Sequence, residues 1–215
     1  MPIGAIPATF EDFYPLSSST ALVVTGGKLW ADASSKRRDY MHNKFVVKLS
    51  YTLNYNAVQL GQVEECVVSG THLRLGNYFE SKLCYSDNYR IYHGENSFLR
   101  DGEQPFLHES GLYYTFEGEI WKDAGVFIPR FDDFSEVCHP TISGEWIYFE
   151  CLSGSAPEGW QVWREHLTTK HRMPVIAHGA NPYVYEGHLY FSAWDDAVRL
   201  LKTHRIKVSE ESSIL

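Results

Sequence analysis

Three patterns are missing from this sequence of 215 residues. No segment keeps apolar residues at i, i+3, i+4 and i+7 for three turns, which excludes a fold built on amphipathic helices. No run of 18 apolar residues occurs, so we expect no spanning helix and no membrane partner. Residues 1–19 lack a basic segment followed by an apolar one, which predicts a cytoplasmic or otherwise non-secreted protein without a signal peptide.

Positive charge and metal-binding motifs are also scarce. The formal net charge is −8 and the sequence pI is about 5.7, whereas nucleic-acid-binding proteins gather Lys and Arg. We therefore expect no nucleic-acid partner. The four cysteines contain no C-x-x-C pair, the ten histidines are scattered, and no glycine-rich phosphate loop is present. We expect no metal and no cofactor, and we expect reduced cysteines.

Aromatic residues are abundant, at 15% of the chain, and they favour strands. One sequence motif recurs five times: an apolar strand, a turn with glycine, and a strand rich in Tyr, Trp and Leu. Its turn glycines are Gly27, Gly70, Gly111, Gly144 and Gly187. These glycines are 43, 41, 33 and 43 residues apart. Repeats of about 40 residues are typical of propeller blades with four strands. The inner hairpins are predicted near residues 21–33, 66–78, 105–118, 140–151 and 182–194.

The predicted fold is all-β: residues 1–215 form a single five-bladed β-propeller domain with four-stranded blades. After the strand expected over residues 198–208, the last blade still lacks one strand. We therefore expect the N-terminal stretch Ile3–Phe10 to pair with that blade and close the ring. Pro174 is expected on an outer edge strand, where a missing N–H does least harm.

A candidate binding site lies at the mouth of the central channel. The residue that enters each inner strand should face the channel, and aligning the five hairpins places a different polar residue there in each blade. Polar groups of different kinds that point to one place suit a small-molecule site. The alternative is that the channel mouth is simply exposed to water and therefore tolerates any polar residue. These ligand-binding candidates are Thr20, Glu65, Gln104, His139 and Asn181. Cys138 and His139 are adjacent in sequence, but alternation along a strand makes them a poor catalytic pair.

The phrases "EQPFLHESGLYYTF", "CHPTISGEWIYFEC" and "ANPYVYEGHLYFSAWD" resemble the blade signature of the five-bladed propeller glycosidases, namely the arabinosidase, xylosidase and invertase families. The resemblance implies a propeller fold and, in those families, a catalytic Asp in an Asp-Pro pair with a second acid. Here the prolines follow Gln104, His139 and Asn181, so the Asp-Pro signature is absent and the catalytic residues are unknown.

Two classes of function follow from these patterns. The first is a propeller that binds a carbohydrate or another small polar ligand and lacks the hydrolytic machinery of the glycosidases. The alternative is a non-enzymatic protein-interaction module or a structural subunit of a larger assembly, for example a virus particle, because one fold hosts many functions. A second alternative is a glycoside hydrolase with a non-standard pair of acids. A glycan, a small polar ligand or a protein is thus the expected partner.

Overall fold

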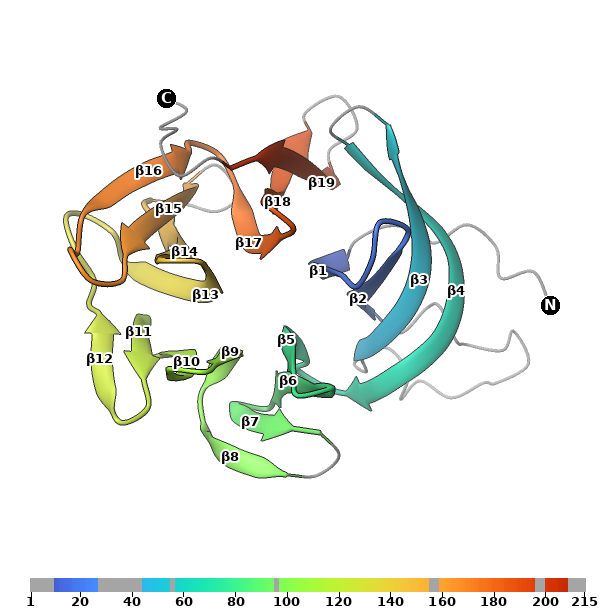
Figure 1. Ribbon diagram of the computed structural model, residues 1–215, viewed down its shortest axis with the longest axis horizontal. Coiled ribbons are helices and arrows are strands. Elements are labelled where there is room, and N and C mark those ends of the chain that lie inside the picture. The colour runs from blue at the N-terminus through green and yellow to red at the C-terminus, as the bar shows by residue number, and fades with distance from the viewer. Residues whose placement is uncertain are drawn as a thin grey trace.

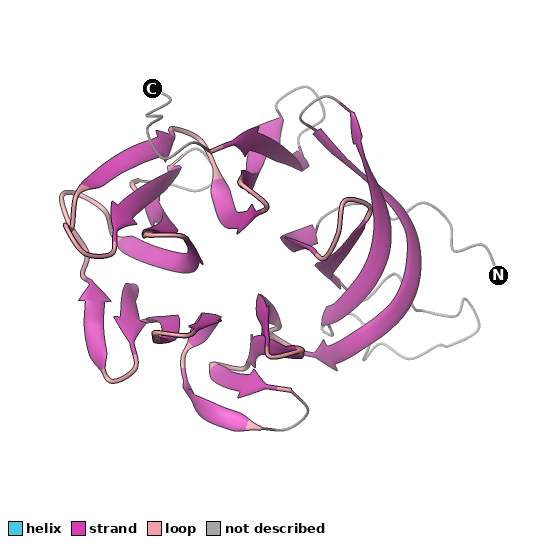
Figure 2. Ribbon diagram, viewed as in Figure 1, coloured by secondary structure: helices cyan, strands magenta, loops and turns pink. Residues whose placement is uncertain are grey.

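The computed structural model describes residues 10–26, 44–54, 57–94, 97–154, 159–195 and 200–208, and all regular secondary structure in these ranges is β-strand (Figure 2). Within them, no helix is long and apolar enough to cross a membrane. The antiparallel strands form five blades around a centre, and the first and last blades share one seven-stranded sheet (Figure 1). The protein is a five-bladed β-propeller, as the recurring hairpins predict.

Each blade runs from an inner strand to an outer one. Blade 1 contains β1 (Phe10–Pro15), β2 (Thr20–Gly26), β3 (Lys44–Asn54) and β4 (Ala57–Gly70). Blade 2 contains β5 (Arg74–Phe79), β6 (Lys82–Asp87), β7 (Arg90–His93) and β8 (Phe98–Asp101). Blade 3 contains β9 (Glu103–His108), β10 (Gly111–Phe116), β11 (Glu119–Lys122) and β12 (Gly125–Ile128).

The last two blades follow the same order. Blade 4 contains β13 (Glu136–Ser143), β14 (Trp146–Leu152), β15 (Trp160–His166) and β16 (Arg172–Ile176). Blade 5 contains β17 (Ala180–Tyr185), β18 (His188–Asp195) and β19 (Leu200–Lys207). Pro174 lies in β16, the outer strand of blade 4, as predicted.

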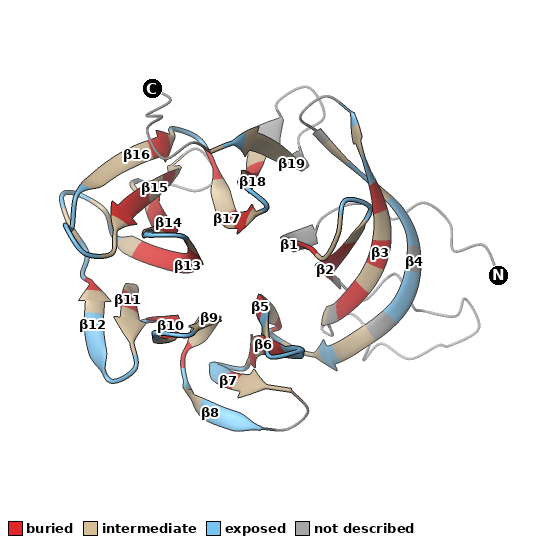
Figure 3. Cartoon of the chain, in the orientation of Figure 1, coloured by how far each residue is buried: buried red, intermediate tan, exposed pale blue. Residues whose placement is uncertain are grey.

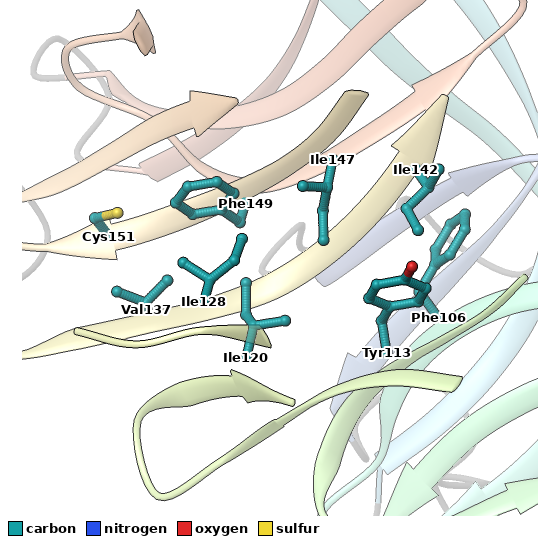
Figure 4. Close-up of a cluster of buried hydrophobic side chains, with 9 residues drawn as sticks. All are labelled: Phe106, Tyr113, Ile120, Ile128, Val137, Ile142, Ile147, Phe149 and Cys151. Carbon is teal, nitrogen blue, oxygen red and sulfur yellow. The ribbon is translucent and has the colours of Figure 1, made fainter. Parts of the chain in front are cut away.

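Alternation along the strands holds the blades together. In β14, Ile147, Phe149 and Cys151 point to one face and pack with Phe106 and Ile120 of blade 3 (Figure 4). Tyr148, on the opposite face, packs with Val184, Leu189 and Phe191 of blade 5. Both faces of an inner sheet are therefore buried, whereas the outer strands β4, β8 and β12 carry much of the exposed surface (Figure 3).

The prediction that Ile3–Phe10 closes the ring is not what the described residues show. Phe10 lies in β1, the inner strand of blade 1, opposite Thr25, and residues 3–9 lie outside the described part of the chain. The strand that meets blade 5 is β4, because the β3–β4 hairpin extends beyond β2 and Ala57 pairs with His204 of β19 (Figure 1). The extended hairpin packs Leu53, Val58 and Leu60 into a cluster with Tyr190 of blade 5.

Three of the five predicted inner hairpins are confirmed, namely those near 105–118, 140–151 and 182–194. The hairpins predicted at 21–33 and 66–78 are wrong, because the inner hairpins of blades 1 and 2 are β1–β2 and β5–β6. Their turns do not use glycine. Ser17 accepts the backbone N–H groups of Ser19 and Thr20, and Glu80 and Ser81 take positive φ angles of 49° and 62°.

Candidate functional site

Each inner strand carries a β-bulge, in which two residues face one residue of the next strand. In blades 3, 4 and 5 the bulge consists of a polar residue and a proline, and in blades 1 and 2 the prolines are absent. The five bulges are Glu11-Asp12, Gly76-Asn77, Gln104-Pro105, His139-Pro140 and Asn181-Pro182. The five inner strands surround the centre (Figure 1), and the bulges of blades 2 to 5 contribute Gly76, Pro105, His139, Pro140, Asn181 and Pro182 to the lining of the central cavity. We call the five bulges the ring of bulges.

The polar residue of the bulge has an unusual backbone conformation. The φ angles of Gln104, His139 and Asn181 are 48°, 57° and 52°, in the left-handed region that few side chains adopt. In blade 2 the position belongs to Gly76, whose φ is not positive; there a side chain is excluded by close packing instead, because an added Cβ would lie only 2.2 Å from the carbonyl oxygen of Pro105. The positive φ angles of the other three are the strained ones. Such strain persists only where the surroundings hold it in place.

The holding contacts come from the preceding blade. The N–H of Gln104 donates to Ser86 Oγ at 3.2 Å, and the N–H of His139 donates to Thr115 Oγ1 at 3.1 Å. The N–H of Asn181 donates to Glu150 Oε2. Ser86, Thr115 and Glu150 are all buried, and each is the fifth residue of the second strand of its blade. Thr115 and Glu150 lie opposite the residue just before the bulge, and Ser86 lies opposite Arg74, one residue further from it. We call these three residues the latch residues.

Glu150 is the exception among the latch residues, because a carboxylate stands where blades 2 and 3 have a hydroxyl. Its side chain lies in a buried pocket, with the residue only 3% exposed. One oxygen, Oε1, accepts the thiol of Cys138 at 3.2 Å and lies 3.6 Å from Nδ1 of His139. Burial alone would raise the pKa of Glu150, but His139, the N–H of Asn181 and Cys138 together lower it. Glu150 is therefore ionised at neutral pH and faces the imidazole of His139.

The same geometry corrects one expectation about Cys138 and His139. Alternation predicted that their side chains would point apart, yet both approach the same oxygen of Glu150, because the bulge at His139 interrupts the alternation. The pair is still not a nucleophile with its base. Burial and the carboxylates of Glu150 and Glu136 raise the pKa of the Cys138 thiol well above its usual value. A protonated, fully buried thiol is inert.

A second carboxyl group lies near this cluster. Burial, together with the negative charge of Glu150, raises the pKa of Glu136 at the start of β13. The two glutamates are thus shifted in opposite directions, which is the pattern of an acid and a base in catalytic pairs. Within the described ranges, no three His, Cys, Asp or Glu side chains are placed to hold a metal ion.

The cavity in the channel is small. Residues from all five blades line it, including Phe13, Gly76, Phe106, His139 and Asn181. Its volume is about 20 Å³, which suffices for one water molecule. A sugar ring does not fit inside a cavity of this size.

No protein-family model matches the chain, and no curated protein matches it. Among solved structures, the crystal structure of the tricorn protease is similar in fold. The alignment has a TM-score of 0.43 and 10% sequence identity, and it covers 97% of this chain and 27% of the protease chain. The chain thus spans about a quarter of the length of that protein, and a match this distant bears on no question of function.

Of the five predicted ligand-binding residues, Gln104, His139 and Asn181 come together in the ring of bulges. Thr20 and Glu65 do not share this position. Thr20 begins β2, and Glu65 lies on the outer strand β4 with a side chain that is 61% exposed, 3.9 Å from Lys48 Nζ. The structure places these two residues outside the ring because the predicted inner hairpins of blades 1 and 2 are misplaced by one strand. By register, Glu11 and Gly76 occupy the equivalent positions.

The three ring residues differ in what they offer a ligand. The Gln104 carboxamide oxygen accepts the Thr115 hydroxyl at 2.8 Å and lies 3.3 Å from the N–H of His139, so it serves the ring itself. His139 is 8% exposed, and Nδ1 of its imidazole faces Glu150. The sequence analysis did not identify the latch residues. Ser86, Thr115 and Glu150 are each the fifth residue of a second strand, so an alignment of the second strands would have placed them at one position.

Proposed function

We propose that this propeller binds a small polar ligand, such as a sugar or another polyol, at the entry of its channel. His139 is the contact group, Asn181 lies beside it, and Glu150 positions the imidazole. The relation to glycosidase propellers inferred from the three proline-containing hairpins is part of this proposal. The absence of their Asp-Pro signature favours binding without hydrolysis.

The observation that carries the proposal is the carboxylate of Glu150 in a latch position. A hydroxyl is enough to hold the bulge of the next blade, as Ser86 and Thr115 show. Burying an ionised carboxylate instead is costly unless it is paired and hydrogen-bonded. The additional partner that Glu150 gains is the imidazole of His139 at 3.6 Å. A histidine oriented in this way by a carboxylate is a common device in ligand and catalytic sites.

A thermal-shift screen against monosaccharides, disaccharides and small polyols tests the proposal. At least one compound should raise the melting temperature, because a ligand that binds only the folded state stabilises it. The shift should become smaller in His139→Gln and stay unchanged in Glu109→Gln, a matched control in an exposed turn of blade 3. A screen without a hit, or a hit indifferent to His139→Gln, would overturn the proposal.

Glycoside hydrolysis is a second candidate, favoured by the opposite pKa shifts of Glu136 and Glu150. Against it, Glu150 is 3% exposed and already contacts Asn181, Cys138 and His139, so it cannot approach an anomeric carbon. We expect no turnover of aryl glycosides. Turnover that is lost in both Glu136→Gln and Glu150→Gln would establish the hydrolase instead.

A protein-interaction role is the third candidate, favoured by large apolar side chains on the rim of blade 2. Phe98 and Leu99 on the outer strand β8 are 54% and 42% exposed, and Tyr89 in the adjacent turn is 66% exposed. Exposed apolar groups on an edge strand suit a protein contact. Sedimentation of the wild type and of a Phe98→Ser, Leu99→Ser variant would reveal self-association through this edge.

A further inference from the structure

A second hollow lies between blades 4 and 5, at the end of these blades where the inner hairpins turn. Its lining comes from the β13–β14 turn, the end of β15, the β17–β18 turn and Val208. The volume is about 390 Å³, nearly twenty times that of the channel cavity. This is at the lower end of the range for small-molecule sites, with room for one or two sugar units. We call it the blade 4–5 groove.

The aromatic wall of the groove is Trp146, which is half-buried. The guanidinium of Arg164 lies 4.2 Å from the centre of its ring, and the ring of His166 meets it edge to face at 5.0 Å. These contacts fix the indole from two sides. The first residue of the second strand is Lys82 in blade 2, Gly111 in blade 3 and His188 in blade 5, so the fold does not require tryptophan there.

Polar groups stand beside the indole in a defined arrangement. Nδ1 of His166 accepts the backbone N–H groups of Thr168 and Thr169, both at 3.2 Å. The proton of the neutral ring is therefore on Nε2, which faces Glu145 Oε2 at 3.4 Å. The Glu145 side chain is 80% exposed. One donor and one carboxylate thus lie together at the edge of an aromatic surface, a set that matches neighbouring hydroxyl groups.

The charges around the groove select the class of ligand. The guanidinium of Arg164, which is 2% exposed, already lies over the ring of Trp146. Its positive charge would repel a cationic ligand placed on the indole. Glu145 and the exposed Glu186 of the neighbouring turn repel an anion. A neutral ligand with hydroxyl groups and an apolar face satisfies both conditions. We propose that the blade 4–5 groove binds a neutral saccharide ring, packed on Trp146 and hydrogen-bonded by Glu145 and His166.

The test is saturation-transfer NMR, followed by titration calorimetry, with methyl pyranosides of glucose, galactose, mannose and xylose and with the matching disaccharides. At least one of these sugars should bind. Affinity should fall about tenfold in Glu145→Gln, since a charge-assisted hydrogen bond contributes about that much. Trp146→Leu should weaken binding further. Because the Glu145 side chain is exposed, its replacement leaves folding intact even if the Trp146 variant unfolds.

Two comparisons separate this groove from the channel entry. Glu109→Gln alters the equivalent turn of blade 3 and should leave sugar affinity unchanged. His139→Gln removes the channel-entry contact, so the sugar binding that remains in this variant is that of the groove and should be weakened by a further Glu145→Gln. Binding that is lost in His139→Gln but retained in Glu145→Gln would assign the sugar to the channel entry and overturn the groove proposal. Absence of binding by every sugar in the panel would overturn it as well.

Discussion

Replacing Thr115 with valine tests the latch between blades 3 and 4. The side chain keeps its shape, but the hydroxyl that accepts the His139 N–H at 3.1 Å and donates to Gln104 Oε1 at 2.8 Å is lost. Thr115 is 5% exposed, so water does not replace the lost partner. The His139 N–H keeps only its longer contact to Gln104 Oε1, at 3.3 Å, and both hydrogen bonds of the buried hydroxyl are lost. Because each hydrogen bond contributes about 0.5–1.5 kcal/mol, we expect the free energy of unfolding to fall by about 2 kcal/mol.

Thr141→Val is the matched control. Thr141 is 1% exposed and its hydroxyl also faces a backbone N–H of the next blade, that of Val184, but at 3.5 Å. A contact of that length is weak, so the loss should stay below about 1 kcal/mol. Urea unfolding at pH 7 measures both variants. Equal losses, or a Thr115 variant as stable as the wild type, would refute the view that the latch holds the bulge.

Three further predictions concern the rest of the ring. Glu150→Gln should lower the free energy of unfolding most near neutral pH. A carboxyl with a lowered pKa stabilises the fold above its unfolded pKa of about 4.5 and loses this effect as the pH falls. In urea unfolding, the difference from the wild type should therefore be smaller at pH 3.5 than at pH 6, and an equal difference would contradict the prediction. Tyr51→Phe removes the 2.7 Å hydrogen bond to the Ser17 carbonyl and should lower the unfolding free energy by about 1 kcal/mol, whereas an unchanged urea midpoint would exclude that contribution to ring closure. Burial raises the pKa of three thiols, those of Cys84 (to about 12), Cys138 and Cys151. They should resist iodoacetamide at pH 8 until the protein unfolds, as peptide mass spectrometry can check. Modification of these thiols in the native protein would show that burial does not protect them.

The fold was predictable from the sequence where glycine or proline marks the hairpin. Blades 3, 4 and 5 have both a turn glycine and a proline in the bulge, and their inner hairpins were placed correctly. Blades 1 and 2 turn at Ser17–Ser19 and at Glu80-Ser81, and the glycine pattern therefore selected the wrong strands there. Ring closure was missed because an overhanging β3–β4 hairpin leaves no periodic signal in the sequence.

The candidate site was predictable in part for the same reason. Gln104, His139 and Asn181 were found through the prolines that follow them, and the misplaced Thr20 and Glu65 came from the two blades without proline. The role of Glu150 depends on contacts between blades, and no pattern within one blade reveals them. The blade 4–5 groove likewise brings together the ends of strands whose spacing in the sequence is irregular.

The most direct test of ligand binding at the channel entry is a crystal structure of the protein with the compound that gives the largest thermal shift. We predict density for that compound over the ring of bulges, within hydrogen-bonding distance of the His139 imidazole, with Glu150 still in contact with that ring. A structure in which the compound is bound elsewhere, while only water contacts His139, would contradict the proposed function.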